Sequence, residues 1–146
     1  MTDDLAWLGG GGVAPAAPEV LAEIHATVDL ERALAGVGLD PALAGTATED
    51  ELLGARVVVV AGLAYAEPST EGRLAGTLAR HDEGPTGRYV RSPIDLAETA
   101  RRANAAGVLI SRPGTGPFGP QVLVLDRRPT GRHLLLVEPR SVPSRR

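Results

Sequence analysis

The chain has 146 residues, a net charge of −3, no cysteine and no lysine; its length suits one domain, and its composition excludes disulfides, thiolate chemistry, Schiff-base lysines and P-loop lysines. Hydrophobic residues make up 43%, which excludes a disordered composition, while aromatic residues make up only 3%, so Val, Leu, Ile and Ala must form the core. The acidic balance and the scarcity of aromatic rings also argue against a nucleic-acid partner.

The N-terminal segment, Met1–Pro18, is predicted to be a flexible arm because it contains four consecutive glycines followed by several prolines. Its apolar residues Leu5, Trp7 and Leu8 can dock on the body or on a partner. The segment lacks the basic region and long apolar core of a signal peptide. No apolar run in the chain approaches the roughly 20 residues of a membrane helix. We therefore expect a cytoplasmic protein with no membrane partner.

The first strand and helix are indicated by residues 20–38. Val20–Val28 alternates in polarity, as a β-strand does. Asp29 is suited to cap a short helix, and Gly38 is suited to end it.

A hairpin is predicted next, after a loop with one turn of helix following Thr48. Four consecutive valines within Arg56–Ala61 are typical of a buried strand. Gly62 allows a tight turn, and Leu63–Glu67 pairs back on that strand.

A helix then joins the two halves of the chain. Ser69 or Thr70 is expected to cap a helix that continues to about Arg80. A polar loop over 81–87 follows, and Gly87–Arg91 is predicted to be the first strand of the second half.

The helix of the second half carries the clearest signals. Ser92 is expected at the N-cap, Pro93 at the first helical position and Asp95 in a capping box. Gly107 is suited to end the helix.

The remaining strands follow in short order. A strand is predicted from Val108–Ser111, then a turn over 116–119 and a hairpin of Val122–Leu125 with Leu134–Val137. The turn of that hairpin is expected at Arg127–Gly131, and Ser141–Arg146 is expected to be a frayed tail.

These segments together resemble the vicinal oxygen chelate superfamily, which has the glyoxalase/bleomycin-resistance-like fold. The resemblance covers roughly Val20–Pro139, and its best segment is the helix within Pro93–Val108. In the first half, Tyr65-Ala66-Glu67-Pro68 and the later Glu83-Gly84 look most like the methylmalonyl-CoA epimerase branch. No single motif carries the resemblance; the order of several weak ones does.

The resemblance implies an α+β fold in which two βαβββ modules form a cleft between curved mixed sheets. We expect a single domain over 19–140, flanked by the arm of residues 1–18 and the tail of residues 141–146. Module one would span 20–68, a connecting helix and loop 69–86, and module two 87–139.

Metal-dependent members of the superfamily hold a divalent cation with His and Glu side chains, one from each of four strands. The resemblance places these four positions near Glu23 or His25, at Ala64, at Thr86 or Gly87, and at Leu135. At least three of the four therefore cannot coordinate a metal. Glu67 and Glu138 lie an odd number of residues from the inward positions, so we expect them on the opposite faces of their strands. No metal and no cofactor is predicted.

The same alignment with the superfamily gives the candidate site residues. His25 and Glu23 are predicted as the general base if the protein is an enzyme, and Arg88 as a partner for an anionic group. The remaining predicted ligand-binding positions in the cleft are Thr86, His133, Leu135 and Ala64. For each polar residue among these, an ordinary surface or packing role is an open alternative.

One other motif is set aside. Gly114, Gly116 and Gly119 match a dinucleotide-binding pattern, but Pro117 and Pro120 flank the last glycine and a strand follows where a helix is needed.

The preferred hypothesis is a metal-independent protein that binds a small organic molecule, as a homodimer; whether it is also a glyoxalase-like lyase or isomerase is left open. The alternatives are a metal-dependent lyase, isomerase or dioxygenase of the same superfamily, and a non-catalytic degenerate subunit that acts as an interaction module.

Overall fold

A single eight-stranded mixed sheet forms the frame of the protein in a computed structural model that describes residues 6–9, 19–125 and 133–139. Its strand order is β2-β3-β4-β1-β5-β8-β7-β6. The strands are β1 (Glu19–Ala26), β2 (Thr48–Asp50), β3 (Ala55–Val60), β4 (Leu63–Pro68), β5 (Gly84–Arg91), β6 (Gly114–Gly116), β7 (Gly119–Leu123) and β8 (His133–Val137). The helices are α1 (Ala6–Gly9), α2 (Leu30–Gly36), the 3₁₀ helix η1 (Pro41–Thr46), α3 (Arg73–His81) and α4 (Leu96–Ala106).

The two halves of the sheet repeat one pattern of strand pairing. In the first half β1 pairs parallel with β4, which pairs antiparallel with β3. In the second half β5 pairs parallel with β8, which pairs antiparallel with β7. An antiparallel β1–β5 ladder joins the halves. The structure therefore has the predicted α+β architecture of two βαβββ modules.

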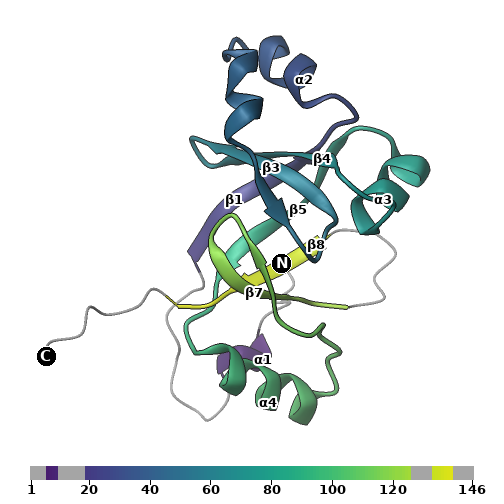
Figure 1. Cartoon of the computed structure of the whole chain (residues 1–146). Helices are drawn as coiled ribbons and strands as arrows, with labels where there is room; N and C mark the ends of the chain where they lie inside the picture. Colours follow the sequence, from purple (N-terminus) through teal and green to yellow (C-terminus); the bar gives the residue numbers. More distant parts are fainter. Residues whose placement is uncertain (1–5, 10–18, 126–132, 140–146) are drawn as a thin grey trace, which may run out of the picture.

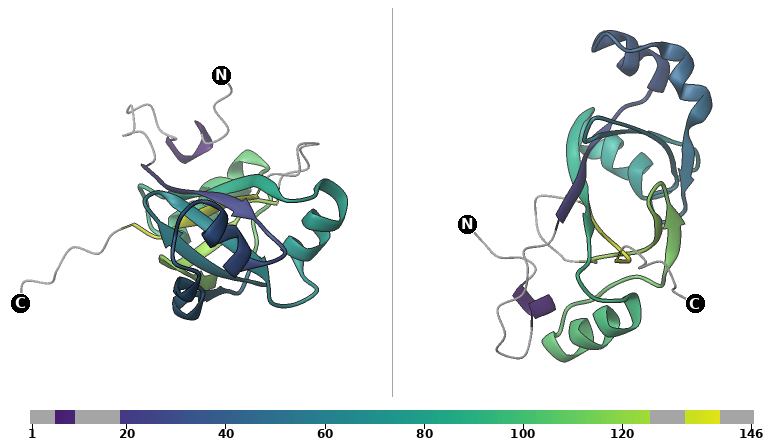
Figure 2. Two further views of the ribbon diagram at one scale, coloured as in Figure 1. Left: turned by 90° about the horizontal axis from the view of Figure 1, so that it is seen from above. Right: turned by 90° about the vertical axis from the view of Figure 1, so that its left-hand side faces the viewer.

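The sheet curls until its two edge strands meet (Figure 2). The backbone N–H of Glu51, directly after β2, donates to the carbonyl oxygen of Thr115 in β6 at 2.9 Å. The Thr115 N–H donates in return to the Glu51 carboxylate at 2.9 Å. We call this junction the seam. It gives the sheet an inner face that is enclosed on most sides.

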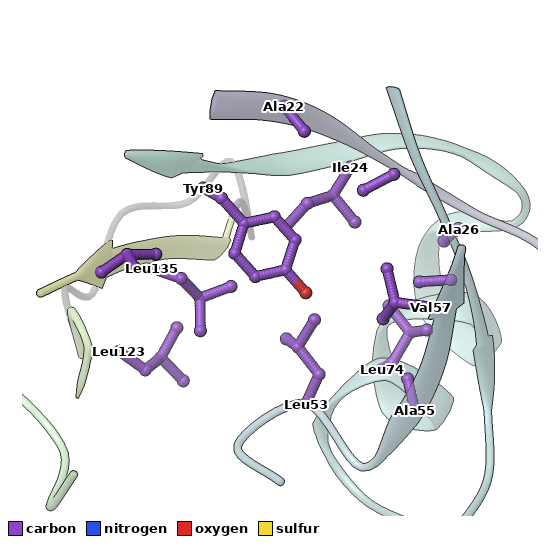
Figure 3. Packing of buried hydrophobic residues seen from close by; sticks show 13 residues of the cluster. Ala22, Ile24, Ala26, Leu53, Ala55, Val57, Leu74, Tyr89, Leu123 and Leu135 are labelled. Carbon is purple, nitrogen blue, oxygen red and sulfur yellow. The ribbon is translucent and has the colours of Figure 1, made fainter. Parts of the chain in front are cut away.

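Alternation along the strands separates an inner core from two outer ones. The inner core draws on both halves and on α3, and includes Ile24, Ala64, Leu74, Tyr89 and Leu135 (Figure 3). On the outer side, α2 and η1 pack against β3 and β4, while α1 and α4 pack against β5, β7 and β8. Figure 1 shows α2 and α4 at opposite ends of the sheet.

Several helix ends follow the predicted chemistry. Asp29 caps α2 by accepting from the Arg32 N–H, and Gly107 ends α4 in the left-handed conformation at φ 74°. Gly62, at φ 81°, makes the predicted turn between β3 and β4. In each case a short polar side chain or a glycine solves a local backbone problem, which is why the sequence alone reveals it.

Other local predictions are wrong. Asp95 rather than Ser92 caps α4, because the Asp95 carboxylate accepts from the Glu98 N–H. Neither Ser69 nor Thr70 caps α3, which begins after Gly72 without a side-chain cap. The turn of helix expected after Thr48 is strand β2, because pairing with β3 satisfies its backbone.

The strand expected at Val108–Ser111 is also wrong in extent: it is reduced to one bridge between Ile110 and Val124. Three further expectations bear on residues outside the described ones: the tail, the turn over 127–131 and most of the N-terminal arm. Within the arm, the described helix α1 buries Leu8 against the second half. No helix in the described part of the chain is long and apolar enough to cross a membrane.

Candidate functional site

A buried carboxylate, Asp50, is the centre of a polar cluster inside the curved sheet. Tyr89 Oη donates to Asp50 Oδ2 at 2.6 Å, and Gln121 Nε2 donates to the same oxygen at 2.9 Å. The backbone N–H groups of Leu52 and Leu53 both donate to Oδ1 at 3.0 Å. These four hydrogen bonds explain how a carboxylate is held in a largely aliphatic interior, where an unpaired one would be costly.

Tyr89 extends from β5 into this interior, where Figure 3 shows its hydroxyl pointing toward the side chain of Leu53. Its ring packs edge-on against Phe118, with ring centroids 5.3 Å apart. Burial, reinforced by the Asp50 carboxylate, raises the pKa of Tyr89. Tyr89 is therefore a hydrogen-bond donor, and it does not ionise near neutral pH.

His133 lies at the start of β8 on the inner face and is 7% exposed. Its Nε2 is 2.9 Å from Thr77 Oγ1 of α3, and that hydroxyl donates to the Arg73 carbonyl at 3.1 Å. Nε2 is thus the protonated nitrogen and Nδ1 the acceptor, as assigned from this network. Burial lowers the pKa of His133 to about 4; Arg73 and Arg80 act in the same direction and Asp50 in the opposite one. The imidazole is neutral at pH 7.

Gln121 leaves one hydrogen-bonding position of the interior unfilled. Its side chain is fully buried, and Nε2 is committed to Asp50. The amide oxygen Oε1 has no partner among the described residues. A Cβ atom on Gly116 would lie 2.7 Å from Gln121 Nε2 and 2.8 Å from Oε1, so the amide packs directly against this glycine. A buried acceptor without a donor is rare in native proteins and points to a bound water or ligand.

An open hollow of about 550 Å³ lies at the seam. We call it the seam hollow. It is lined by Glu51, Leu52, Ser111, Arg112, Pro113 and Gly114. Gly114 is also the ladder partner of Gln121, which places the hollow beside the strand that carries the unfilled acceptor.

Three of the predicted site residues lie on the inner face. Ala64 and Leu135 are fully buried members of the inner core, and His133 is on the same face of β8 as Leu135. The structure brings His133 together with Thr77 rather than with His25 or Glu23.

Glu23, His25 and Arg88 do not lie in the interior. Ala22, Ile24 and Ala26 carry the inner face of β1, so Glu23 and His25 are on its outer face. The expectation that they line the cleft with Ala64 is corrected for that reason. The sequence does indicate this orientation, because the apolar residues of β1 stand at even positions and Glu23 and His25 at odd ones. The alignment with the superfamily predicts the opposite face.

Arg88 is also displaced from the expected cleft. Arg88 lies between the inward residues Gly87 and Tyr89 and pairs with Leu134, which packs in an outer core. Its Nε is buried without a partner among the described residues. Thr86 falls at an irregularity, because Ile24 pairs with Gly87 and His25 with Pro85.

His25 instead lines a second cavity of about 470 Å³ on the outer face, which we call the outer hollow. It lies between α2 and the strands β1 and β4, and Tyr65, Arg32, Val37, Leu63 and Glu83 are among its other lining residues. The ring centroids of His25 and Tyr65 are 6.0 Å apart.

The residues of the interior do not fit a divalent metal. Within residues 6–9, 19–125 and 133–139, no group of three or more His, Cys, Asp or Glu side chains is placed to hold an ion. Ala64 and Leu135 offer no ligand atoms, and all the hydrogen bonds of Asp50 are made to protein donors. No step of a reaction is therefore assigned to a metal here.

Sequence reasoning missed Asp50, Gln121 and Thr77 as parts of the interior. In the sequence, an aspartate shortly before Leu52 and Leu53 is typical of an Asx turn, in which the carboxylate accepts from a backbone N–H two residues on. Nothing in that pattern indicates a functional site. Gln121 alternates correctly with Leu123 on β7, so its inward direction was readable from the sequence. Its hydrogen-bond partner Asp50 could not be predicted from the sequence, because it lies 71 residues away.

The comparisons with known proteins concern the fold. The sequence matches no protein-family model and no curated protein. The structure of methylmalonyl-CoA epimerase from Mycobacterium tuberculosis is similar, with a TM-score of 0.69 at 19% identity over 88% of this chain and 93% of that one. A variant of the Streptomyces coelicolor methylmalonyl-CoA epimerase, in complex with 2-nitronate-propionyl-CoA, gives 0.67 at 20% identity over 89% and 100%.

A hypothetical protein from Bacillus halodurans gives a TM-score of 0.64 at 14% identity, over 89% of this chain and 100% of that one. At these identities the likeness establishes a shared fold, the glyoxalase-like fold expected from the sequence. It carries no ligand or activity over to this chain.

Proposed function

We propose that the protein binds a small organic molecule at the seam, without a metal, and that the ligand donates a hydrogen bond to Gln121 Oε1. The observation that carries this proposal is the unfilled acceptor: a fully buried amide oxygen with no partner among the described residues. Neighbouring hydrogen bonds hold the Gln121 side chain in place, since Nε2 is fixed by Asp50. The acceptor is therefore preorganised, which lowers the entropic cost of binding.

The seam hollow is the proposed location of the ligand's body. Its volume of about 550 Å³ lies within the range of small-molecule sites. Arg112 lines it and makes no ion pair with a carboxylate among the described residues. A ligand with an anionic group would satisfy this cation. Ligands of the structurally similar epimerases are CoA thioesters, so these are the first compounds to test.

His133 is the interior side chain suited to proton transfer, because its imidazole is neutral at pH 7 and Nδ1 is an acceptor. We propose it, with Ala64 and Leu135, as part of the interior wall of the site. Should catalysis occur, a lyase or isomerase step that moves a proton suits this arrangement. Glu23, His25 and Arg88 are not part of this interior site.

The test is ligand binding by the full chain, measured by calorimetry with and without a chelator. Methylmalonyl-CoA, propionyl-CoA and free CoA are the probes. We expect a thioester to bind equally well with and without the chelator. Gln121→Met should weaken binding about tenfold, because one buried hydrogen bond is worth about 1 kcal/mol or more. Arg112→Gln should weaken binding of the carboxylate-bearing probe more than that of propionyl-CoA.

Arg101→Gln is the matched control, since Arg101 is an exposed arginine of α4 outside the seam hollow. Equal binding by wild type and Gln121→Met would place the ligand elsewhere. A requirement for added Zn²⁺, Co²⁺ or Mn²⁺ would overturn metal independence and support the metal-dependent alternative. Absence of binding by both methylmalonyl-CoA and propionyl-CoA would remove CoA thioesters as the ligand class.

The assembly and location are proposed on the sequence alone. We propose a cytoplasmic homodimer, and sedimentation of the purified chain at micromolar concentration tests the dimer. A monomer across the concentration range would contradict it.

A further inference from the structure

Two pairs of residues occupy equivalent places in the two halves of the sheet. His25 pairs with Tyr65 across the parallel β1–β4 ladder, and Val90 pairs with Leu136 across the parallel β5–β8 ladder. Two residues after His25 and Val90 stand Thr27 and Ser92, whose hydroxyl oxygens lie 3.2 and 2.8 Å from the carbonyl oxygen two residues further on. An aspartate that caps a helix follows in each half. The equivalence therefore extends through strand, turn and helix.

The surroundings of the two pairs differ. Val90 and Leu136 are buried beneath α1, and Leu8 is part of their apolar cluster. His25 and Tyr65 instead line the outer hollow of about 470 Å³. Val37 and Leu63, which also line the hollow, are 55% and 40% exposed. Tyr65 is 5% exposed and packs with Leu30 and Leu34 of α2, whereas His25 is only partly buried.

The polar groups of the outer hollow restrict what it can hold. The His25 ring nitrogens and the Tyr65 hydroxyl make no hydrogen bond to a described residue. The charged groups are already compensated: Arg32 Nη2 lies 2.8 Å from Glu83 Oε2, which also accepts from Thr27 Oγ1 and the Val28 N–H. Those bonds, the Val28 one foremost, lower the pKa of Glu83, so the pair stays charged at neutral pH. The hollow thus combines apolar walls with hydrogen-bonding groups that have no partner among the described residues.

We propose that the outer hollow is a second binding site, for an uncharged ring compound with a hydroxyl group, of the phenol class. The ring packs against Val37 and Leu63, and the hydroxyl hydrogen-bonds with His25 and Tyr65. The site is independent of the interior, since Ile24 and Ala64 face the opposite side of the same strands. Replacement of the aliphatic pair by His and Tyr favours a polar small molecule over an apolar helix as the occupant.

The experiment is an NMR titration of the full chain with p-cresol, following the imidazole signals of its three histidines, assigned by single His→Gln variants. We expect the His25 signals to shift saturably, while those of His81 and His133 stay in place. Tyr65→Phe should weaken binding about fivefold through loss of one hydrogen bond.

Gly36→Phe is the blocking variant, because Gly36 lines the hollow and a Cβ atom there meets no atom within 4 Å. It should abolish the shifts. Gly45→Phe makes the same change at an equally open glycine of η1 that does not line the hollow, and should leave them intact.

Chemical shift changes that persist in Gly36→Phe would overturn the assignment of the site to the outer hollow. Tighter binding of benzoate than of p-cresol would overturn the assignment of an uncharged ligand. The alternative occupant of the outer hollow is helix α1 of a second copy of the chain, and sedimentation tests it. If the wild-type chain forms a dimer that Gly36→Phe dissociates, the small-molecule assignment is overturned. Neither outcome bears on binding at the seam, which is measured separately with Gln121→Met.

Discussion

Tyr89 and Asp50 join the two halves of the protein through a 2.6 Å hydrogen bond inside the curved sheet. Asp50 ends β2 of the first half, and Tyr89 belongs to β5 of the second. Gln121, also from the second half, donates to the same carboxylate oxygen. One buried carboxylate therefore links strands that the sheet order places far apart, at the point where the sheet closes on itself.

Removal of the Asp50 carboxylate is expected to be strongly destabilising. Asp50→Ala leaves the Tyr89 hydroxyl, the Gln121 amide and two backbone N–H groups without their acceptor. We expect a loss of about 3–5 kcal/mol in the free energy of unfolding, measured with urea. Tyr89→Phe removes only one donor and should cost about 1–2 kcal/mol.

The double variant separates the bond from simple loss of packing. If the two groups act through one hydrogen bond, the combined loss is smaller than the sum of the single losses by about 1 kcal/mol or more. Additive losses would contradict the role of Asp50 as a link between the halves.

Stability is expected to fall between about pH 6.5 and pH 4 because of His133. Its pKa is lowered from 6.5 to about 4 in the folded state, so the unfolded chain binds more protons in this window. The free energy of unfolding therefore decreases as the pH falls through it, by about 3 kcal/mol at pH 4. Above pH 6.5 the effect vanishes, because both states are then unprotonated.

The measurement is urea unfolding of wild type and His133→Asn across pH 4 to 8. The variant keeps a side-chain donor for Thr77 but has no titrating group, so the acid-induced loss should be smaller by this amount. Parallel pH profiles for the two proteins would show that His133 is not the buried neutral group described.

Gly87 is expected to tolerate no side chain. A Cβ atom there would lie 1.9 Å from the carbonyl oxygen of His133, on the adjacent strand β8. Gly87→Ala must therefore separate β5 from β8, and we expect a loss of at least about 3 kcal/mol or failure to fold. Gly36→Ala is the control, since a Cβ there meets no atom within 4 Å; it should be neutral or stabilising by up to about 1 kcal/mol. Thermal unfolding followed by circular dichroism compares the two.

The N-cap of α4 is expected to depend on Asp95 and not on Ser92. Asp95→Ala removes the acceptor of the Glu98 N–H and should cost about 1 kcal/mol. Hydrogen exchange resolves the position: Asp95→Ala should accelerate exchange of the Glu98 amide. Ser92→Ala should leave that amide protected, because Ser92 accepts from the Ile94 N–H instead. The reverse result would restore Ser92 as the cap.

Much of the fold was predictable from short stretches of sequence. The four consecutive valines of β3, the turn glycine Gly62, the cap Asp29 and the helix stop Gly107 are local signals, and the structure confirms them. Each reflects the steric demands of one strand, turn or helix end, which neighbouring residues alone decide.

The candidate site was predictable only in part. Ala64, His133 and Leu135 lie on the inner face as expected, whereas Glu23 and His25 lie on the outer one. The error arose because an alignment with the family's ligand positions is uncertain by one residue, and one residue reverses the face of a strand.

The sequence by itself determined the order of most strands and helices and the aliphatic nature of the core, because both depend on local alternation and composition. Only the tertiary structure decided which polar groups meet. Asp50 is 39 residues from Tyr89 and 71 from Gln121, and His133 is 56 from Thr77. Contacts over such separations follow from the curvature and closure of the sheet, which no local pattern encodes.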